Sequence, residues 1–316
     1  MTERLTLATW PTPLEPAPRL ATALGLAPDD LWVKRDDLVG LGGGGNKVRK
    51  LEATLAEALA QGATAVVTSG AAQSNHARLT AAAGARLGLE VTLVLAGEPP
   101  EPPERSTGNL LLDELLGARL VWAGATSLAD LDAVVEQEAA RLRSAGTPTY
   151  VVPYGGSNVA GAGAYAEAGH EILGQAPDTS LVVAAVGSGG TMAGLVHALG
   201  VDRVLGVDTG AVPDPGDRVA QLLAGLGTPV ASADLRLRRD LVGEGYGVLS
   251  AEVRAAMELV ARTEGIVLDP VYTGRAAAGL VAGVREGVVV AGRRTVLLHS
   301  GGLPGLFGHL GATDWS

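Results

Sequence analysis

A lysine that follows a run of glycines is the residue with the clearest chemical potential in this sequence. Residues 40–52 read GLGGGGNKVRKLE, and Lys47 falls in the first turn of an amphipathic helical pattern. A glycine-rich loop lets the backbone approach a ligand closely. The positive end of the helix dipole disfavours a cation, so the pKa of Lys47 should be lowered and its nucleophilic form favoured. Schiff-base chemistry requires that form, although a flexible loop before a solvated helix has the same pattern.

Lysine is scarce, which narrows the choice of a catalytic amine. Only Lys34, Lys47 and Lys50 occur, and arginine supplies nearly all the other positive charge. Any reaction that needs a lysine therefore has three candidates.

A second polar group opens a predicted helix directly after the apolar run at 65–69. Ser74, Asn75 and His76 stand within SGAAQSNHARL. The free N–H groups of a helix N-terminus bind anions, which suits a substrate carboxylate. A simple helix cap by Ser74 or Asn75 is the alternative.

A third motif, LVVAAVGSGGTMAGL at 181–195, reads as a buried strand, a Gly/Ser turn and a helix. Backbone amides in such a turn can hold a phosphate; the residues concerned are Gly187, Ser188, Gly189, Gly190 and Thr191. Asp208 follows about twenty residues later, as the ribose-binding acid does in dinucleotide-binding units. Met192, however, stands where the third glycine of that fingerprint belongs. The motif alone does not decide whether the ligand is a dinucleotide or a smaller phosphorylated cofactor.

Two segments near the C-terminus place polar residues at the ends of apolar runs. Tyr272 lies in LDPVYTGRAAAGL, and His299 and Ser300 lie in LLHSGGLPGLFG. α/β sheets carry ligand-binding groups at the carboxyl ends of strands, although Tyr272 could equally be a packed aromatic. The other histidines lack the spacing of metal ligands, so we expect no metal site.

Composition excludes several classes of partner. The chain has 316 residues, 47% of them hydrophobic, with a formal net charge of −10 and no cysteine. A negative surface repels nucleic acid and anionic lipid, and no run of about 18 apolar residues could span a membrane. The N-terminus lacks the basic and apolar regions of a signal peptide. We expect a cytoplasmic protein without nucleic-acid or membrane partners.

Short β-branched runs alternate with longer Ala/Leu-rich segments, which predicts an α/β fold with mainly parallel sheets flanked by helices. The predicted strands are 31–34, 65–69, 91–95, 119–122, 149–152, 181–186, 204–207 and 295–299. The predicted helices are 46–60, 76–87, 128–144, 190–199, 251–264 and 274–286. Residues 98–103 are proline-rich and predict a surface connection. The Gly/Ser/Asn-rich stretch 154–163 predicts a hinge.

Seven motifs occur in one order over nearly the whole chain: KRDDL (34–38), GGNKVRKLE (44–52), QSNHAR (73–78), PYGGSN (153–158), GSGGT (187–191), DPVYTG (269–274) and HSGG (299–302). In this combination the chain resembles the family of D-cysteine desulfhydrases and 1-aminocyclopropane-1-carboxylate (ACC) deaminases. Those enzymes use pyridoxal 5'-phosphate (PLP) and share the tryptophan-synthase β-subunit fold, known as PLP fold type II. Each motif alone is weak, but the ordered set is specific.

The resemblance implies a role for each matching residue. Lys47 matches the lysine that binds PLP covalently, Lys50 matches a phosphate-contacting lysine, and 187–191 match the phosphate loop. Asn75 matches the partner of the 3'-oxygen of PLP. Ser74, His76 and Gly156 match positions beside the substrate. Tyr272 looks like the tyrosine against the cofactor ring, Tyr246 looks like a second active-site tyrosine, and Lys34 is similar to a structural residue.

The resemblance also implies an architecture in which a smaller domain, 48–158, is inserted into a larger PLP-binding domain formed by 1–47 and 159–316. The cofactor would lie in the cleft between them. A homodimer is implied as well, and a small amino acid is the implied substrate.

Two departures from the ACC deaminase pattern bear on the substrate. ACC deaminases have DPVYEG and HLGG, whereas this chain has Thr273 and Ser300 at those positions. A carboxylate beside the pyridine nitrogen would hold a proton there better than a hydroxyl does. β-Elimination of a thiolate needs less help from the ring than cyclopropane opening. The resemblance therefore favours D-cysteine desulfhydration, with ACC or another β-substituted amino acid such as cysteate as alternatives.

Overall fold

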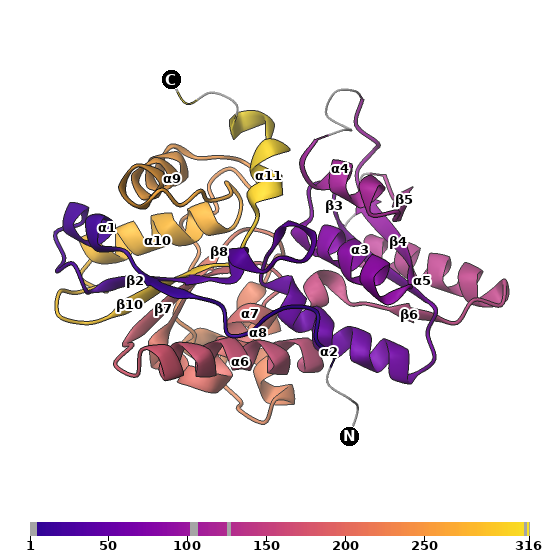
Figure 1. The fold of residues 1–316 in the computed structure, drawn as a ribbon, viewed down its shortest axis with the longest axis horizontal. Helices are drawn as coiled ribbons and strands as arrows, with labels where there is room; N and C mark the ends of the chain where they lie inside the picture. The colour runs from indigo at the N-terminus through magenta and orange to yellow at the C-terminus, as the bar shows by residue number, and fades with distance from the viewer. Residues whose placement is uncertain (1–4, 102–106, 125–127, 313–314, 316) are drawn as a thin grey trace.

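The computed structural model describes residues 5–101, 107–124, 128–312 and 315 and has two separate sheets flanked by helices (Figure 1). The larger sheet has, in spatial order, β1 (Leu14–Pro16), β2 (Leu31–Arg35), β10 (Thr295–His299), β7 (Leu181–Val186), β8 (Val204–Asp208) and β9 (Leu237–Arg238). The smaller sheet has β5 (Arg119–Trp122), β4 (Glu90–Ala96), β3 (Ala65–Ala71) and β6 (Thr149–Val151). Only the β1–β2 pair is antiparallel. The predicted α/β fold with two mainly parallel sheets is confirmed.

The helices, in chain order, are α1 (Pro18–Ala23), α2 (Lys47–Ala60), α3 (Asn75–Leu87), α4 (Gly108–Leu115), α5 (Leu128–Ser144), α6 (Val159–Gln175), α7 (Gly190–Leu199), α8 (Pro215–Gly225), α9 (Ala251–Glu264), α10 (Thr273–Arg285) and α11 (Leu303–Phe307). In the described part of the chain, no helix is both long and apolar enough to cross a bilayer.

Both faces of the larger sheet are buried, which explains why β7 reads as an uninterrupted apolar run. Leu181, Val183 and Ala185 of β7 pack in one core with α1, α9 and α10. Val182 and Ala184 face the opposite core with α6, α7 and α8. Figure 1 shows these two helical layers above and below the sheet.

The smaller sheet is also covered on both faces. Val66 of β3 packs in the core that includes α2 and α3, and its neighbour Val67 packs against α5. All four strands of this sheet fall between residues 65 and 151, inside the segment 48–158. The domain boundaries at 47/48 and 158/159 remain a prediction.

The expected hinge at 154–163 is wrong in its second half. Residues Tyr154–Gly156 form a 3-10 turn, η4, but α6 already begins at Val159. The side chain of Asn158 accepts a hydrogen bond from the Gly161 N–H at 2.8 Å, which caps the helix. A glycine is required at position 161 in its first turn, because a Cβ there would lie 2.2 Å from the Gly156 carbonyl oxygen. Of the predicted connection 98–103, Pro102 and Pro103 lie outside the described residues.

Candidate active site

The carboxyl ends of strands from both sheets meet at one cavity, to which α2, α3 and α7 present their N-termini. Its wall is formed by Asn46, Lys47, Lys50, Ser74, Asn75, His76, Tyr154, Gly155, Ala185, Val186, Gly187, Ser188, Gly189, Thr191, Met192, Tyr272 and Ser300. Most of the predicted site residues are thus brought together. Four are not on the wall: Gly156, Gly190, Tyr246 and Thr273.

Lys47 is half-buried at the first position of α2, facing the cavity. Burial lowers the pKa of Lys47 to about 8. The pKa is lowered, as predicted, and burial is the cause. A substantial fraction of this amine is therefore neutral near physiological pH, and neutral amine is the nucleophilic and basic form.

Lys50 lies one helical turn further on and is buried without a carboxylate partner among the described residues. Its Nζ donates to Ser157 Oγ at 3.1 Å and is 3.5 Å from the Gly155 carbonyl oxygen. Burial, followed by repulsion from Lys47, lowers the pKa of Lys50 well below its ordinary value. Such a site gains most from an anion that supplies the missing negative charge.

The glycine turn before α7 forms a cradle next to Lys50. A Cβ at Gly190 would lie 2.6 Å from Ser157 Oγ and 2.9 Å from Lys50 Nζ, so a larger residue there would displace both of these polar groups. Gly189 has a φ of +90° at the N-cap of α7, a conformation that favours glycine. The Gly190 N–H already donates to Ser157 Oγ. This cradle, together with Lys50, has the kind of donor set that binds a phosphate group, as the sequence predicts.

None of the residues on the cavity wall carries a carboxylate. Burial, then the charges of Lys47 and Lys50, also lowers the pKa of His76 well below its ordinary value. The cavity thus contains basic side chains and backbone donors, with no carboxylate on its wall to balance a positive charge. This donor set fits a phosphorylated cofactor with an aldehyde for Lys47, as PLP has.

His76 is neutral, and its tautomer follows from its neighbours. The Thr68 hydroxyl donates to the Val152 carbonyl at 2.8 Å, so it can only accept from His76 Nε2, at 2.8 Å. His76 Nδ1 is then a lone-pair acceptor, buried without a partner among the described residues. Ser74 caps α3 by accepting from the Ala77 N–H at 3.2 Å. The N–H groups of Asn75 and His76 have no backbone acceptor in the described residues and suit a carboxylate.

Three tyrosines meet at one end of the cavity. The hydroxyls of Tyr246 and Tyr272 are 2.8 Å apart, and the two rings pack edge to face. Tyr246 therefore reaches the site through Tyr272 rather than as part of the wall. Tyr154, which the sequence patterns did not single out, lies on the wall in η4. Burial raises the pKa of both Tyr154 and Tyr272, so their hydroxyls stay protonated.

Thr273 does not occupy the place expected for it. Its hydroxyl donates to Asp269 Oδ1 at 2.7 Å and accepts from the Asp269 N–H at 2.8 Å, which ties the first residue of α10 to the segment before the helix. Both of its hydrogen-bonding roles are thus used locally, and the side chain is buried away from the cavity. Ser300 does lie on the wall. The imidazole of His299 instead supports the backbone, with Nδ1 accepting from the Gly301 N–H.

Asn46 and Ser157 are site residues that the sequence patterns missed. Asn46 donates through Nδ2 to Thr191 Oγ1 at 3.0 Å, and its backbone N–H donates to the Ser300 carbonyl at 2.9 Å. The Ser157 hydroxyl is hydrogen-bonded to Lys50 Nζ, to the Ser188 hydroxyl and to the Gly190 N–H. Both residues lie inside motifs named above, next to residues that were predicted to belong to the site. Their position in those motifs was the only indication in the sequence.

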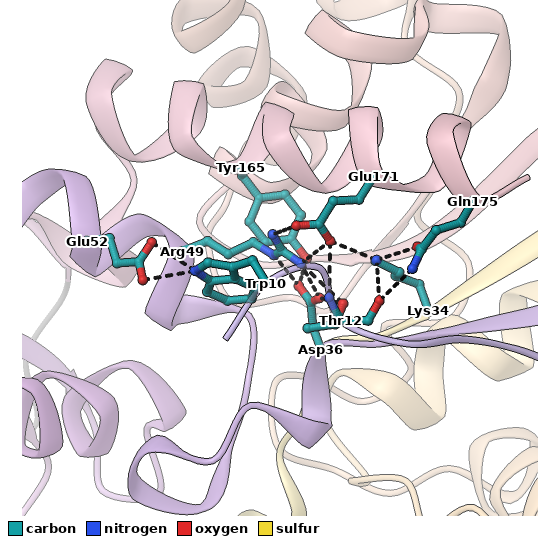
Figure 2. Close-up of polar contacts among 9 residues, drawn as sticks. All are labelled: Trp10, Thr12, Lys34, Asp36, Arg49, Glu52, Tyr165, Glu171 and Gln175. Atoms are coloured by element: carbon teal, nitrogen blue, oxygen red, sulfur yellow. Dashed lines mark hydrogen bonds and ion pairs between the residues drawn. The ribbon is translucent and has the colours of Figure 1, made fainter. Parts of the chain in front are cut away.

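Lys34 lies outside the cavity in a buried charge network (Figure 2). Its Nζ forms an ion pair with Glu171 at 2.7 Å and donates to Gln175 and to the Thr12 carbonyl, each at 2.8 Å. Arg49 of α2 joins the same network by bonding to both Asp36 and Glu171. The network attaches the first turn of α2, with Lys47, to α6. Lys34 has a structural role.

Asp208 does not act as a ribose-binding acid in this structure. Its Oδ1 accepts from the Gly210 N–H at 2.8 Å, its Oδ2 is 3.4 Å from Arg239, and it is not on the cavity wall. The dinucleotide alternative therefore has no support from this residue.

Replacing Thr191 by alanine should weaken PLP binding by about 1.5–3 kcal/mol, the contribution of a hydrogen bond to a charged group. Because Thr191 Oγ1 accepts from Asn46, its own hydrogen is free for the cradle. The dissociation constant of PLP, measured by equilibrium dialysis, tests this. Thr191→Ser should retain most of the affinity. Equal losses in both variants would show that the hydroxyl is not the contact.

Comparisons with known proteins agree with PLP as the cofactor. A family model described as pyridoxal-phosphate dependent enzyme matches residues 5–301. A D-cysteine desulfhydrase of Salmonella schwarzengrund is 39% identical, covering 97% of this chain and 96% of that protein. A Pyrococcus abyssi protein, named provisionally as an ACC deaminase, is also 39% identical, covering 96% and 93%.

A crystal structure of an ACC deaminase homologue superposes with a TM-score of 0.86 at 36% identity, covering 96% of this chain and 93% of the other. Fold and sequence thus agree over nearly the full length. The chain belongs to the pyridoxal-phosphate dependent enzyme family, among relatives named as D-cysteine desulfhydrases and ACC deaminases.

Proposed function

We propose that this protein converts D-cysteine and water to pyruvate, ammonia and hydrogen sulfide. The observation that carries the proposal is the cavity wall, which has Ser300 but no carboxylate. A wall of this kind offers no group to hold a proton firmly on a pyridine nitrogen. It suits elimination of a good leaving group better than the opening of a cyclopropane ring.

When bound, PLP supplies an electron sink for negative charge developing at the substrate α-carbon. Lys47 is the residue placed to bind the cofactor and then, once displaced by the substrate amine, to take the α-proton at Nζ. The pKa of about 8 suits both roles because the neutral and protonated amines are both accessible near neutral pH. The C–S bond then breaks with its electron pair on sulfur, and the sulfur leaves as sulfide.

The substrate carboxylate would bind at the N-terminus of α3. The N–H groups of Asn75 and His76 have no backbone acceptor within the described ranges, and Ser74 lies on the wall beside them. Binding at this point fixes the α-carbon relative to Lys47. Burial keeps the hydroxyls of Tyr272 and Tyr246 protonated. When Tyr246 donates the hydrogen bond between them, the Tyr272 hydrogen is available to the cofactor or to the leaving sulfur.

Alternative substrates follow from the same site. ACC is one, because two of the similar proteins carry ACC deaminase in their names. Another β-substituted amino acid such as cysteate is a second, because the wall combines polar hydroxyls with cationic groups. From the family resemblance we also propose a homodimer, which light scattering of the purified protein would test.

We expect kcat/KM for D-cysteine to exceed that for ACC by roughly 100-fold or more, a difference of about 2.7 kcal/mol between the transition states. Ser300→Leu should lower the ratio of kcat/KM for D-cysteine to kcat/KM for ACC about tenfold, because it replaces a hydroxyl on the wall by an apolar side chain. Ser300→Ala separates loss of the hydroxyl from added bulk. Product assays for sulfide and 2-oxobutyrate measure both rates. A wild-type preference for ACC would refute the proposed substrate.

A further inference from the structure

Asn75 lies on the cavity wall, and hydrogen bonds from two neighbouring side chains fix the orientation of its amide. Asn75 Oδ1 accepts from Asn109 Nδ2 at 3.1 Å and from Arg78 Nη2 at 3.4 Å. An arginine can only donate, so the atom that faces it must be the oxygen. The Asn75 amide nitrogen is left as a donor toward the cavity.

The orientation of the Asn109 side chain is fixed in turn by a backbone carbonyl, because a carbonyl oxygen can only accept a hydrogen bond. Asn109 Nδ2 donates to the Gln73 carbonyl at 2.9 Å, and the Asn109 N–H donates to Gln73 Oε1 at 2.7 Å. Both amide hydrogens of Asn109 are therefore used, one on Gln73 and one on Asn75. Asn109 is completely buried in α4, and its Oδ1 has no partner among the residues that the structure describes. A reversed amide would place this oxygen against two other oxygens.

Arg78 links the same group to the loop that precedes Lys47. It is completely buried and donates to the carbonyls of Gly42 and, at 3.1 Å, Gly44. The glycine loop and Asn75 are thus positioned by one guanidinium. The charge of Asp113 acts on Arg78. Asp113 is buried with no hydrogen-bond partner in the described part of the chain, and burial raises its pKa to about 8.

We propose that Asn109, with Arg78, is a positioning residue that holds the Asn75 amide nitrogen toward the cofactor. The inference rests on PLP binding to Lys47 but not on the identity of the substrate. In PLP the phenolic oxygen is on the ring carbon next to the one bearing the aldehyde carbon, so attachment to Lys47 brings this oxygen close to that lysine. A fixed donor beside it stabilises its negative charge and makes the nearby Lys47 linkage easier to deprotonate.

The test is a pH titration of the visible absorbance of PLP-loaded protein. Asn109→Asp is almost isosteric but replaces the donor by oxygens, so it should turn the Asn75 amide around. We expect the midpoint of the titration to rise by about one pH unit or more, and PLP affinity to fall about tenfold. Asn109→Ala removes one of two donors and should give a smaller change of the same sign. Leu111→Ala, at an exposed position of the same helix, should change neither quantity.

A double-mutant cycle with Asn75→Ala distinguishes positioning from a general structural effect. If Asn109 acts through Asn75, Asn109→Asp should cause no further shift in the Asn75→Ala background. A shift of equal size in both backgrounds would overturn the proposal, and so would no shift in the wild-type background. If Asn109→Asp does not fold, the same cycle is read with Asn109→Ala. No substrate is used, so a failure here is independent of the preference for D-cysteine.

Discussion

Lys47→Ala should abolish covalent attachment of PLP and lower turnover by about 1,000-fold or more, because one residue serves as both the attachment point and the base. Borohydride reduction followed by peptide mass spectrometry locates the attachment. In wild-type protein stripped of PLP, the rate of attachment should rise as the pH increases through about 8, because the neutral amine reacts and burial sets its pKa there. A rate that is flat from pH 7 to 9 would contradict this account of Lys47.

Lys34 and Lys50 provide the controls, since the chain has no other lysine. Lys34→Met removes a buried amine outside the cavity, so attachment at Lys47 should persist while stability falls. Lys50→Met should leave Lys47 able to react but weaken retention of PLP, because the cradle loses its cation. Cofactor trapped on Lys34 or Lys50 in the wild-type protein would refute the assignment.

The fold was predictable from sequence where burial leaves a periodic signal. The strand Leu181–Val186 and the helices Leu128–Ser144, Gly190–Leu199 and Ala251–Glu264 have the predicted bounds. Short elements such as β1, β9 and α11 were missed. They span two to five residues, fewer than a pattern with a period of 3.6 residues or of two needs to become visible.

The site was predictable where a residue type is scarce or opens a helix. Lys47 could be found because lysine is rare, and Ser74 because it follows a strand and begins a helix. Thr273 was misplaced because its position in the motif does not reveal that Asp269, four residues earlier, occupies its hydroxyl. Ser157 and Asn46 were missed because their partners are 31 to 145 residues away in the chain.

The buried network around Asp36 determines whether α2 is held in place. Asp36 is fully buried and accepts two bonds from Arg49, one from the Tyr165 hydroxyl at 2.7 Å and one from the Thr12 hydroxyl at 2.8 Å (Figure 2). Burial alone would raise the pKa of Asp36, but Arg49 and the hydrogen bonds outweigh it and lower the pKa. Arg49 is two residues from Lys47, so the network connects stability with the geometry of the site.

Asp36→Ala should therefore destabilise the protein by about 3–5 kcal/mol, because it leaves the buried Arg49 without one of its two carboxylates. Asp240→Ala, which breaks an exposed pair with Arg238, should cost no more than about 1 kcal/mol. Urea unfolding of both variants at pH 7 gives the two free energies.

A carboxylate with a depressed pKa stabilises the fold above its ordinary pKa and loses this effect as the pH falls through the folded value. The difference between wild type and Asp36→Ala should accordingly shrink on acidification below about pH 4. PLP affinity should fall in Asp36→Ala and not in Asp240→Ala, since only the former loosens the first turn of α2. Equal stabilities for the two variants, or a difference that grows on acidification, would mean that Asp36 does not hold this helix.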